Sequence, residues 1–116
     1  MTGQPARETA LDRLHHFSDE LNAARDAAYN AVGATRSTSD STTRRAVATA
    51  YSHLADVYER VSADVCTFPG GDLLSTVLID AESGAKQDAR DWNELADTAA
   101  AREAADDTKP KTDNAS

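Results

Sequence analysis

The stretch "VCTFPGGDLL", residues 65–74, separates two long segments that have helical periodicity. Phe68 stands before a proline, and a proline disfavours helical geometry in the residue that precedes it. Gly70 and Gly71 permit backbone angles that other residues resist. Asp72 can cap a helix that starts there, because negative charge is favoured at a helix N-terminus. The stretch therefore predicts a tight bend between two helices.

Working outward from this bend, three segments carry apolar residues at alternating intervals of three and four, as amphipathic helices do. We expect helices over residues of about 5–32, 42–66 and 72–105. Gly33 follows the last periodic residue of the first segment, where a left-handed glycine cap is expected.

The polar connector "ATRSTSDST", residues 34–42, offers several caps for the second helix. Ser37 and Asp40 have the spacing of a capping box, and Ser39, Asp40 or Ser41 could each act as a single cap. The sequence leaves the choice open.

The third segment has a predicted core stripe made of Leu73, Leu74, Val77, Leu78, Ala81, Ala85, Trp92, Leu95 and Ala99. Gly84 interrupts it, and a glycine in mid-helix costs about 1 kcal/mol relative to alanine. The pattern does not decide whether the helix continues through this glycine or breaks there.

Short connections favour antiparallel neighbours, so we expect an all-α, antiparallel up-down-up three-helix bundle with coiled-coil-like packing. The bundle should occupy residues 1–106, and residues 107–116 should form a disordered polar tail. When the helices are aligned at their loops, Trp92 lies level with Ala28 and Ala46. We expect its ring to fill the space that these alanines leave in the core.

The composition predicts a thin core, because the chain has 23 alanines but only 21 larger aliphatic or aromatic residues. A net charge of −8 argues against direct binding to nucleic acid or to anionic membranes. No apolar run approaches the ~18 residues of a membrane span, and the first residues do not resemble a signal peptide. A single cysteine suits a reducing cytoplasm. Nine arginines against three lysines, beside abundant alanine, are typical of a GC-rich bacterial or phage genome.

The residues with reactive side chains form no convincing catalytic or cofactor site. Cys66 ends a helix, where the helix dipole disfavours a thiolate, so we expect a buried structural thiol. The glycines at the bend lack the preceding strand and the "GK[ST]" of a phosphate loop. His15 and His16 have metal-capable spacing to Asp19 and Glu20, but they fall outside the predicted seam. We therefore expect no enzyme activity, no cofactor and no metal site.

The remaining hypothesis is a cytoplasmic interaction or structural protein that binds another copy of itself, another protein, or both. The candidate shared surface comprises Leu11, Leu14, Phe17, Tyr51, Tyr58 and Ile79. A first alternative is an acidic antagonist that mimics nucleic acid and binds a basic protein through Asp88, Asp91, Glu94 and Asp97. A second alternative is a metal-dependent enzyme of bundle type that uses His15 or His16.

Overall fold

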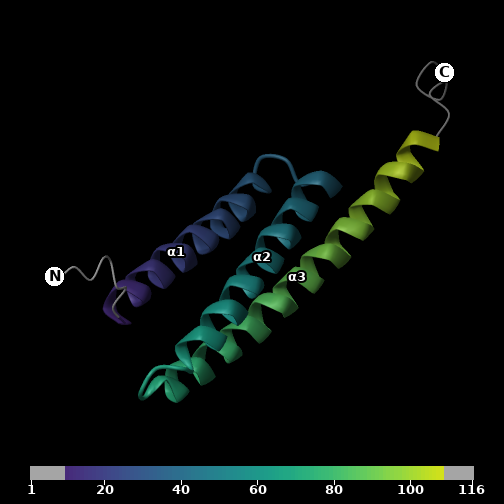
Figure 1. Ribbon diagram of the computed structural model, residues 1–116. Helices are drawn as coiled ribbons and strands as arrows, with labels where there is room; N and C mark the ends of the chain where they lie inside the picture. The colour runs from purple at the N-terminus through teal and green to yellow at the C-terminus, as the bar shows by residue number, and fades with distance from the viewer. Residues whose placement is uncertain (1–9, 109–116) are drawn as a thin grey trace, which may run out of the picture.

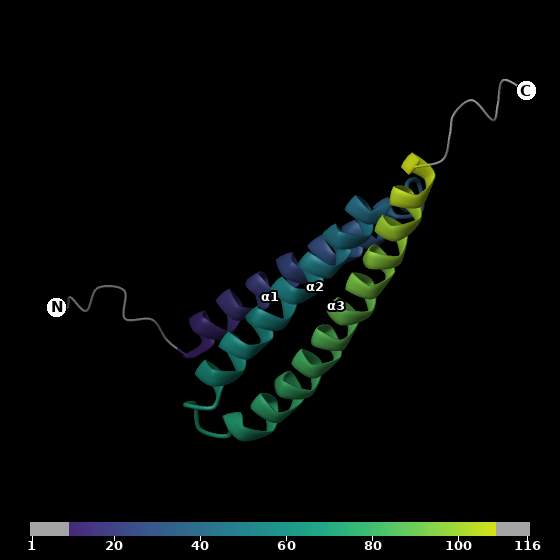
Figure 2. The ribbon, with the colours of Figure 1, turned by 90° about the vertical axis from the view of Figure 1, so that its right-hand side faces the viewer.

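A computed structural model describes residues 10–108, and this range forms three α-helices. They are α1 (Ala10–Ala34), α2 (Ser41–Val65) and α3 (Gly71–Thr108). α1 and α3 both run antiparallel to α2, which lies between them (Figure 1). A view turned by a quarter shows α3 running beside the whole length of α2 (Figure 2). The predicted all-α, up-down-up three-helix bundle is confirmed. Residues 107 and 108 continue α3, and the rest of the predicted tail lies outside the described residues.

The start of α2 is fixed by Asp40, one of the candidate caps. Its carboxylate accepts a hydrogen bond from the Thr43 backbone N–H at 2.8 Å, and the Thr43 hydroxyl accepts one from the Asp40 N–H at 3.0 Å. This is a capping box. Glu103 adds a second carboxylate, which accepts from the Ser41 N–H at 2.8 Å and from the Ser41 hydroxyl at 2.6 Å. The C-terminal part of α3 therefore holds the N-terminus of α2.

α1 ends two residues later than the sequence predicts. The helix passes through Gly33 to Ala34, and Thr35 and Arg36 then donate their N–H groups to the carbonyls of Val32 and Gly33. These i→i−3 bonds satisfy the carbonyls at the helix end without a left-handed residue. The predicted left-handed cap at Gly33 is wrong, since Gly70 is the one glycine in the described range with a positive φ.

The predicted bend between α2 and α3 is confirmed, and its two glycines act differently. Gly70 has φ +74°, which favours glycine. Gly71 begins α3 and donates its N–H to the Phe68 carbonyl at 2.9 Å. A Cβ on Gly71 would stand 2.0 Å from the Val65 carbonyl oxygen, so this glycine is needed for close approach. Asp72 lies in the first turn of α3 and not at the predicted cap position, although its charge is still favoured there.

α3 packs against α2 through small side chains. The buried positions of α3 follow intervals of three, four or seven, and they are Gly71, Ser75, Leu78, Ala85, Ala89, Ala96 and Ala99. Ala48, Ala55 and Ser62 are buried at intervals of seven on α2. The hydroxyls of Ser62 and Ser75 lie 2.8 Å apart, so these buried polar groups satisfy each other. α3 continues unbroken through Gly84, which is exposed.

This small-residue seam turns the predicted core stripe of α3 partly outward. Leu73, Leu74, Val77 and Leu95 are exposed, and Trp92 is half-buried. The prediction that Trp92 fills a core space beside Ala28 and Ala46 is wrong, and Ala46 itself is exposed. The reason is that no Cα atoms of α1 and α3 lie within 8 Å of each other, so α1 does not cover this side of α3.

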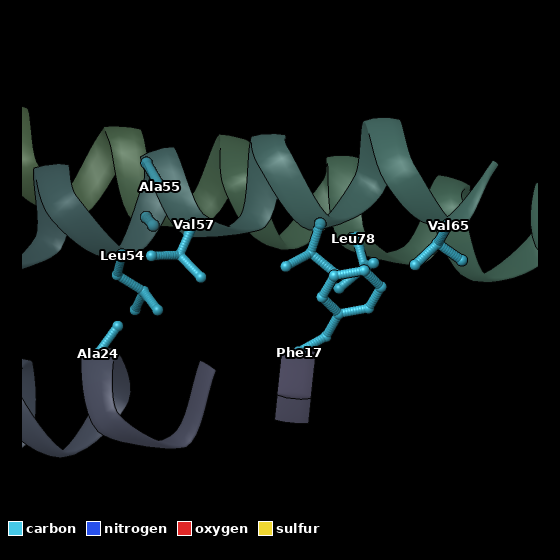
Figure 3. Close-up of a cluster of buried hydrophobic side chains, with 9 residues drawn as sticks. Phe17, Ala24, Leu54, Ala55, Val57, Val65 and Leu78 are labelled. Carbon is cyan, nitrogen blue, oxygen red and sulfur yellow. The ribbon is translucent and has the colours of Figure 1, made fainter. Parts of the chain in front are cut away.

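Two of the largest buried side chains, Phe17 and Leu78, lie near the α2–α3 bend. Phe17 of α1 reaches across toward Val65 of α2 and Leu78 of α3, while Ala24 lies beneath Leu54 (Figure 3). Three valines of α2 complete this core, and they are Val57, Val61 and Val65. Val47 is also fully buried, nearer the start of α2. The core is therefore centred on α2, with Phe17 bridging the gap between the outer helices.

Candidate protein-interaction surface

An apolar groove runs between α1 and α3 at the end of the bundle that carries the α2–α3 bend. Leu14, Phe17 and Leu21 of α1 form one wall, and Leu74 and Leu78 of α3 form the other. Val61 and Val65 of α2 lie at its floor. We call this feature the apolar groove; its volume is about 240 Å³. It exists because α1 and α3 both pack on α2 while their Cα atoms stay more than 8 Å from each other.

The α3 rim of the groove is apolar: Leu74 lines the groove itself, and Leu73 and Val77 adjoin Leu74 on the outer side of the helix. Leu73 is 76% exposed, Val77 is 56% exposed and Leu74 is 42% exposed. Leu14 stands on the α1 wall with 36% exposure. Contiguous exposed aliphatic side chains are typical of interaction sites, whereas single scattered ones are common on any protein surface.

The N-terminal half of α1 is tethered to the bend, which holds the groove walls in place. Arg13 forms an ion pair with Asp64 of α2. Its guanidinium carbon also lies 4.6 Å from the centre of the Phe68 ring. Phe68 stacks in turn with Phe17, with 6.5 Å between ring centres. The bend thus positions both the core phenylalanine and the start of α3.

Further from the bend, the space beside α1 becomes polar. Arg25 lines both the apolar groove and the next hollow, where it lies with Tyr29 and Tyr51. Burial, and after it the negative charge of Asp88, raises the pKa of the Tyr51 hydroxyl above 10.0. Arg25 on α1 and Asp88 on α3 are therefore level with Tyr51 along the bundle.

The six residues predicted for a shared surface fall in different places. Leu14 and Phe17 line the apolar groove, although Phe17 is itself buried. Tyr51 and Tyr58 are half-buried against the core. Ile79 is 52% exposed, but it lies about 200° around the α3 axis from Val77. The side chain of Leu11 lies outside the described residues.

The four residues of the predicted acidic face are all exposed. Asp97 accepts a hydrogen bond from the Arg45 guanidinium at 2.7 Å, and Asp91 accepts one from Gln87 at 2.8 Å. Asp88 and Asp97 are nine residues apart, which places them about 180° apart around the helix. The four carboxylates therefore do not form one stripe.

The residues with metal-binding or nucleophilic side chains also lie at the surface. His15 and His16 are exposed, and His16 Nε2 lies 3.7 Å from a Glu20 carboxylate oxygen. Among residues 10–108, no cluster of three or more His, Cys, Asp or Glu side chains could hold a metal ion. Cys66 is exposed and its thiol donates to the Ala63 carbonyl at 3.0 Å, so the prediction of a buried thiol is wrong. Cys66 is the C-cap of α2, and its N–H still donates to the Ser62 carbonyl.

Sequence reasoning missed Leu73, Leu74 and Val77 as surface residues because it assigned the largest apolar side chains to the core. One signal could have separated them. Gly71, Ser75 and Leu78 have the same alternating spacing as the large residues, and the glycine and the serine permit closer helix packing. Arg25 gave no signal, because its importance comes from its position beside the groove.

No helix in the described part of the chain is both long enough and apolar enough to cross a membrane. In comparisons with known proteins, the chain matches no family model, no curated protein and no solved structure.

Proposed function

We propose that this chain is a non-enzymatic helical-bundle protein that binds other proteins, and in the first place another copy of itself. The observation that carries the proposal is the exposed aliphatic rim of Leu73, Leu74 and Val77 beside the apolar groove. A groove between two helices accepts the apolar side of a further helix, since helix packing buries such surfaces. The alanine-rich core supports the same proposal, because a thin core gains stability from association.

The first test is the mass of the protein in solution, measured by light scattering behind a sizing column at low and high salt. We expect about twice the chain mass of 12.3 kDa at both salts. Apolar contacts are insensitive to screening, so the dimer should persist when salt rises.

A pair of matched variants locates the surface. Leu73→Ser combined with Val77→Ser should give the mass of a single chain, because both side chains are removed from the rim. Ile79→Ser should leave the dimer intact, because Ile79 is equally exposed but lies elsewhere on α3. A wild-type protein that is monomeric at all concentrations would contradict self-association. A dimer that survives the double substitution would place the interface elsewhere.

We further propose that the protein works in the cytoplasm. Support comes from Cys66, the single cysteine of the chain, whose thiol is exposed. An exposed lone thiol suits a compartment that keeps thiols reduced.

An acidic antagonist of a basic protein is a second proposal, supported by the exposure of Asp88, Asp91, Glu94 and Asp97. It has less support, because these carboxylates are distributed around α3 and Asp97 is paired with Arg45. It predicts a monomer that binds a basic protein, with an affinity that falls steeply as salt rises.

A further inference from the structure

Along the bundle axis, the walls of the apolar groove present aliphatic residues first, at the level nearest the bend, and charged residues at a second level further away. Leu14 of α1 and Leu74 of α3 face the groove near the bend. Arg25 lies eleven residues after Leu14 on α1, and Asp88 lies eleven residues after Val77 on α3. Eleven helical residues span about 16 Å. Because α1 and α3 run in the same direction, the apolar level and the charged level succeed one another in the same order on both walls.

At the second level the α1 wall presents Arg25 next to Asp26, and the α3 wall presents Asp88. Arg25 and Asp88 are both level with Tyr51. The ion pairs of residues 10–108 include neither Arg25 nor Asp88. Each therefore keeps its charge available for a partner that approaches the groove.

We propose that a second copy of the chain covers the groove, with the two copies related by a two-fold axis parallel to the helices. This proposal rests on the self-association argued above. The axis places α1 of each copy over α3 of the other at the same level. Leu14 then meets the Leu73–Val77 rim of the second copy, and Arg25 meets Asp88 of the second copy. Symmetry makes each contact twice.

Two observations favour a second copy over other occupants. Residues 1–9 and 109–116 contain one large apolar side chain, Met1, so they cannot cover an aliphatic rim of this size. Arg25 of one wall is also complementary in charge to Asp88 of the other, at the level of Tyr51, and both walls carry aliphatic side chains nearer the bend. A two-fold axis perpendicular to the helices would instead stack α1 on α1, which sets the charged level against the apolar level.

The test is a charge exchange between two variants, followed by sedimentation equilibrium at low salt. In its own dimer, the Arg25→Glu variant sets a carboxylate against Asp88 at both contacts, and the Asp88→Arg variant sets two guanidinium groups against each other at both. Each variant should dimerise about tenfold more weakly than the wild type, because two exposed ion pairs become two repulsions. In an equimolar mixture, the mixed dimer has one contact between two native partners and one between two exchanged partners. If residue 25 of each chain faces residue 88 of the other, both contacts in the mixed dimer are ion pairs. The mixture should therefore dimerise with an affinity close to the wild-type value.

Glu94→Arg is the matched control, because it makes the same charge change on an exposed position of α3 away from the groove. Its affinity should equal that of the wild type, and circular dichroism should show full helix content for every variant. If the single variants keep wild-type affinity, or if mixing fails to restore it, this geometry is wrong. A wild-type dimer with these results would overturn only the geometry, whereas a wild-type monomer would overturn the proposed function as well.

Discussion

Gly71 lies where the start of α3 comes into close contact with the backbone at the end of α2. It is buried at the first position of α3, and the Val65 carbonyl oxygen occupies the space that a side chain would need. Gly84 has the opposite setting, because it lies in mid-helix with no atom within 4 Å of an added Cβ. Gly71 is therefore needed for steric reasons, whereas Gly84 only adds the conformational cost of a glycine within a helix.

Substituting these glycines should have opposite effects on the free energy of unfolding. Gly71→Ala should lower it by at least about 2 kcal/mol, because the bend or the seam must shift. Gly84→Ala should raise it by about 1 kcal/mol, because alanine is the better helix former and meets nothing. Urea denaturation of the three proteins measures both changes. A neutral Gly71→Ala would show that α2 and α3 are not in close contact at the bend.

Asp40 should make the stability of α2 depend on pH. The hydrogen bond from the Thr43 backbone, followed by that from the Thr43 side chain, holds the pKa of the Asp40 carboxyl below its ordinary value of 3.8. A carboxyl group whose pKa is lower in the folded state than in the unfolded state stabilises the folded protein at any pH above the unfolded-state pKa. This stabilisation is lost as pH falls through the folded-state pKa.

A carboxyl-detected NMR titration should therefore place the Asp40 midpoint below 3.8. Asp40→Asn keeps a side chain that accepts the capping hydrogen bond but does not titrate. Between pH 4 and pH 2 the variant should therefore lose less stability than the wild type, and the difference should correspond to the protonation of about one carboxyl group. A midpoint at or above the ordinary value would contradict the capping box.

At the scale of the helix, the seam between α2 and α3 depends on small side chains. Ala96 is fully buried in the seam, whereas its neighbour Leu95 is 45% exposed. One residue of helix rotates a side chain by about 100°, so adjacent positions can face the seam and the solvent. The larger side chain of this pair is the one that lies outside.

Enlarging the side chain at position 96 and, in a separate variant, shortening the one at position 95 should reveal which of the two faces α2. Ala96→Leu should lower the free energy of unfolding by about 1–3 kcal/mol, because the seam has no room for the added atoms. Leu95→Ala should change it by less than about 0.5 kcal/mol, as exposed substitutions do. Thermal and urea unfolding measure both. If Leu95→Ala proves the more damaging, α3 is rotated relative to the arrangement described here.

At the scale of the whole molecule, the arrangement is open. α2 is covered on two sides, while α3 keeps the aliphatic residues Leu73, Leu74 and Val77 in water and Leu14 of α1 stays partly exposed beside them. Such a molecule gains stability when a second chain covers the groove, because binding to the folded state shifts the unfolding equilibrium.

The melting temperature should therefore depend on protein concentration. A tenfold increase should raise it by about 3 °C, which is the effect expected for a dimer of small chains. The variant with Leu73→Ser and Val77→Ser should melt at a temperature independent of concentration. Calorimetry over a tenfold concentration range distinguishes these outcomes, and a concentration-independent wild type would contradict a dimer of folded chains.

The sequence by itself determined the three helices, their order and the bend at residues 65–74. These features depend on local chemistry: apolar spacing, the capping groups around Asp40, and the glycines before α3. The spacing also placed Leu14 and Phe17 on the apolar side of α1, and both line the apolar groove; their role in a shared surface stays a prediction.

Only the tertiary structure decided which side of α3 is buried. The apolar spacing of α3 fits two faces, one with large aliphatic residues and one with small residues. Close backbone approach at Gly71 and the Ser62–Ser75 hydrogen bond select the small face. That choice leaves Leu73, Trp92 and Leu95 outside the core. It depends on contacts between residues distant in sequence, which spacing within one helix does not contain.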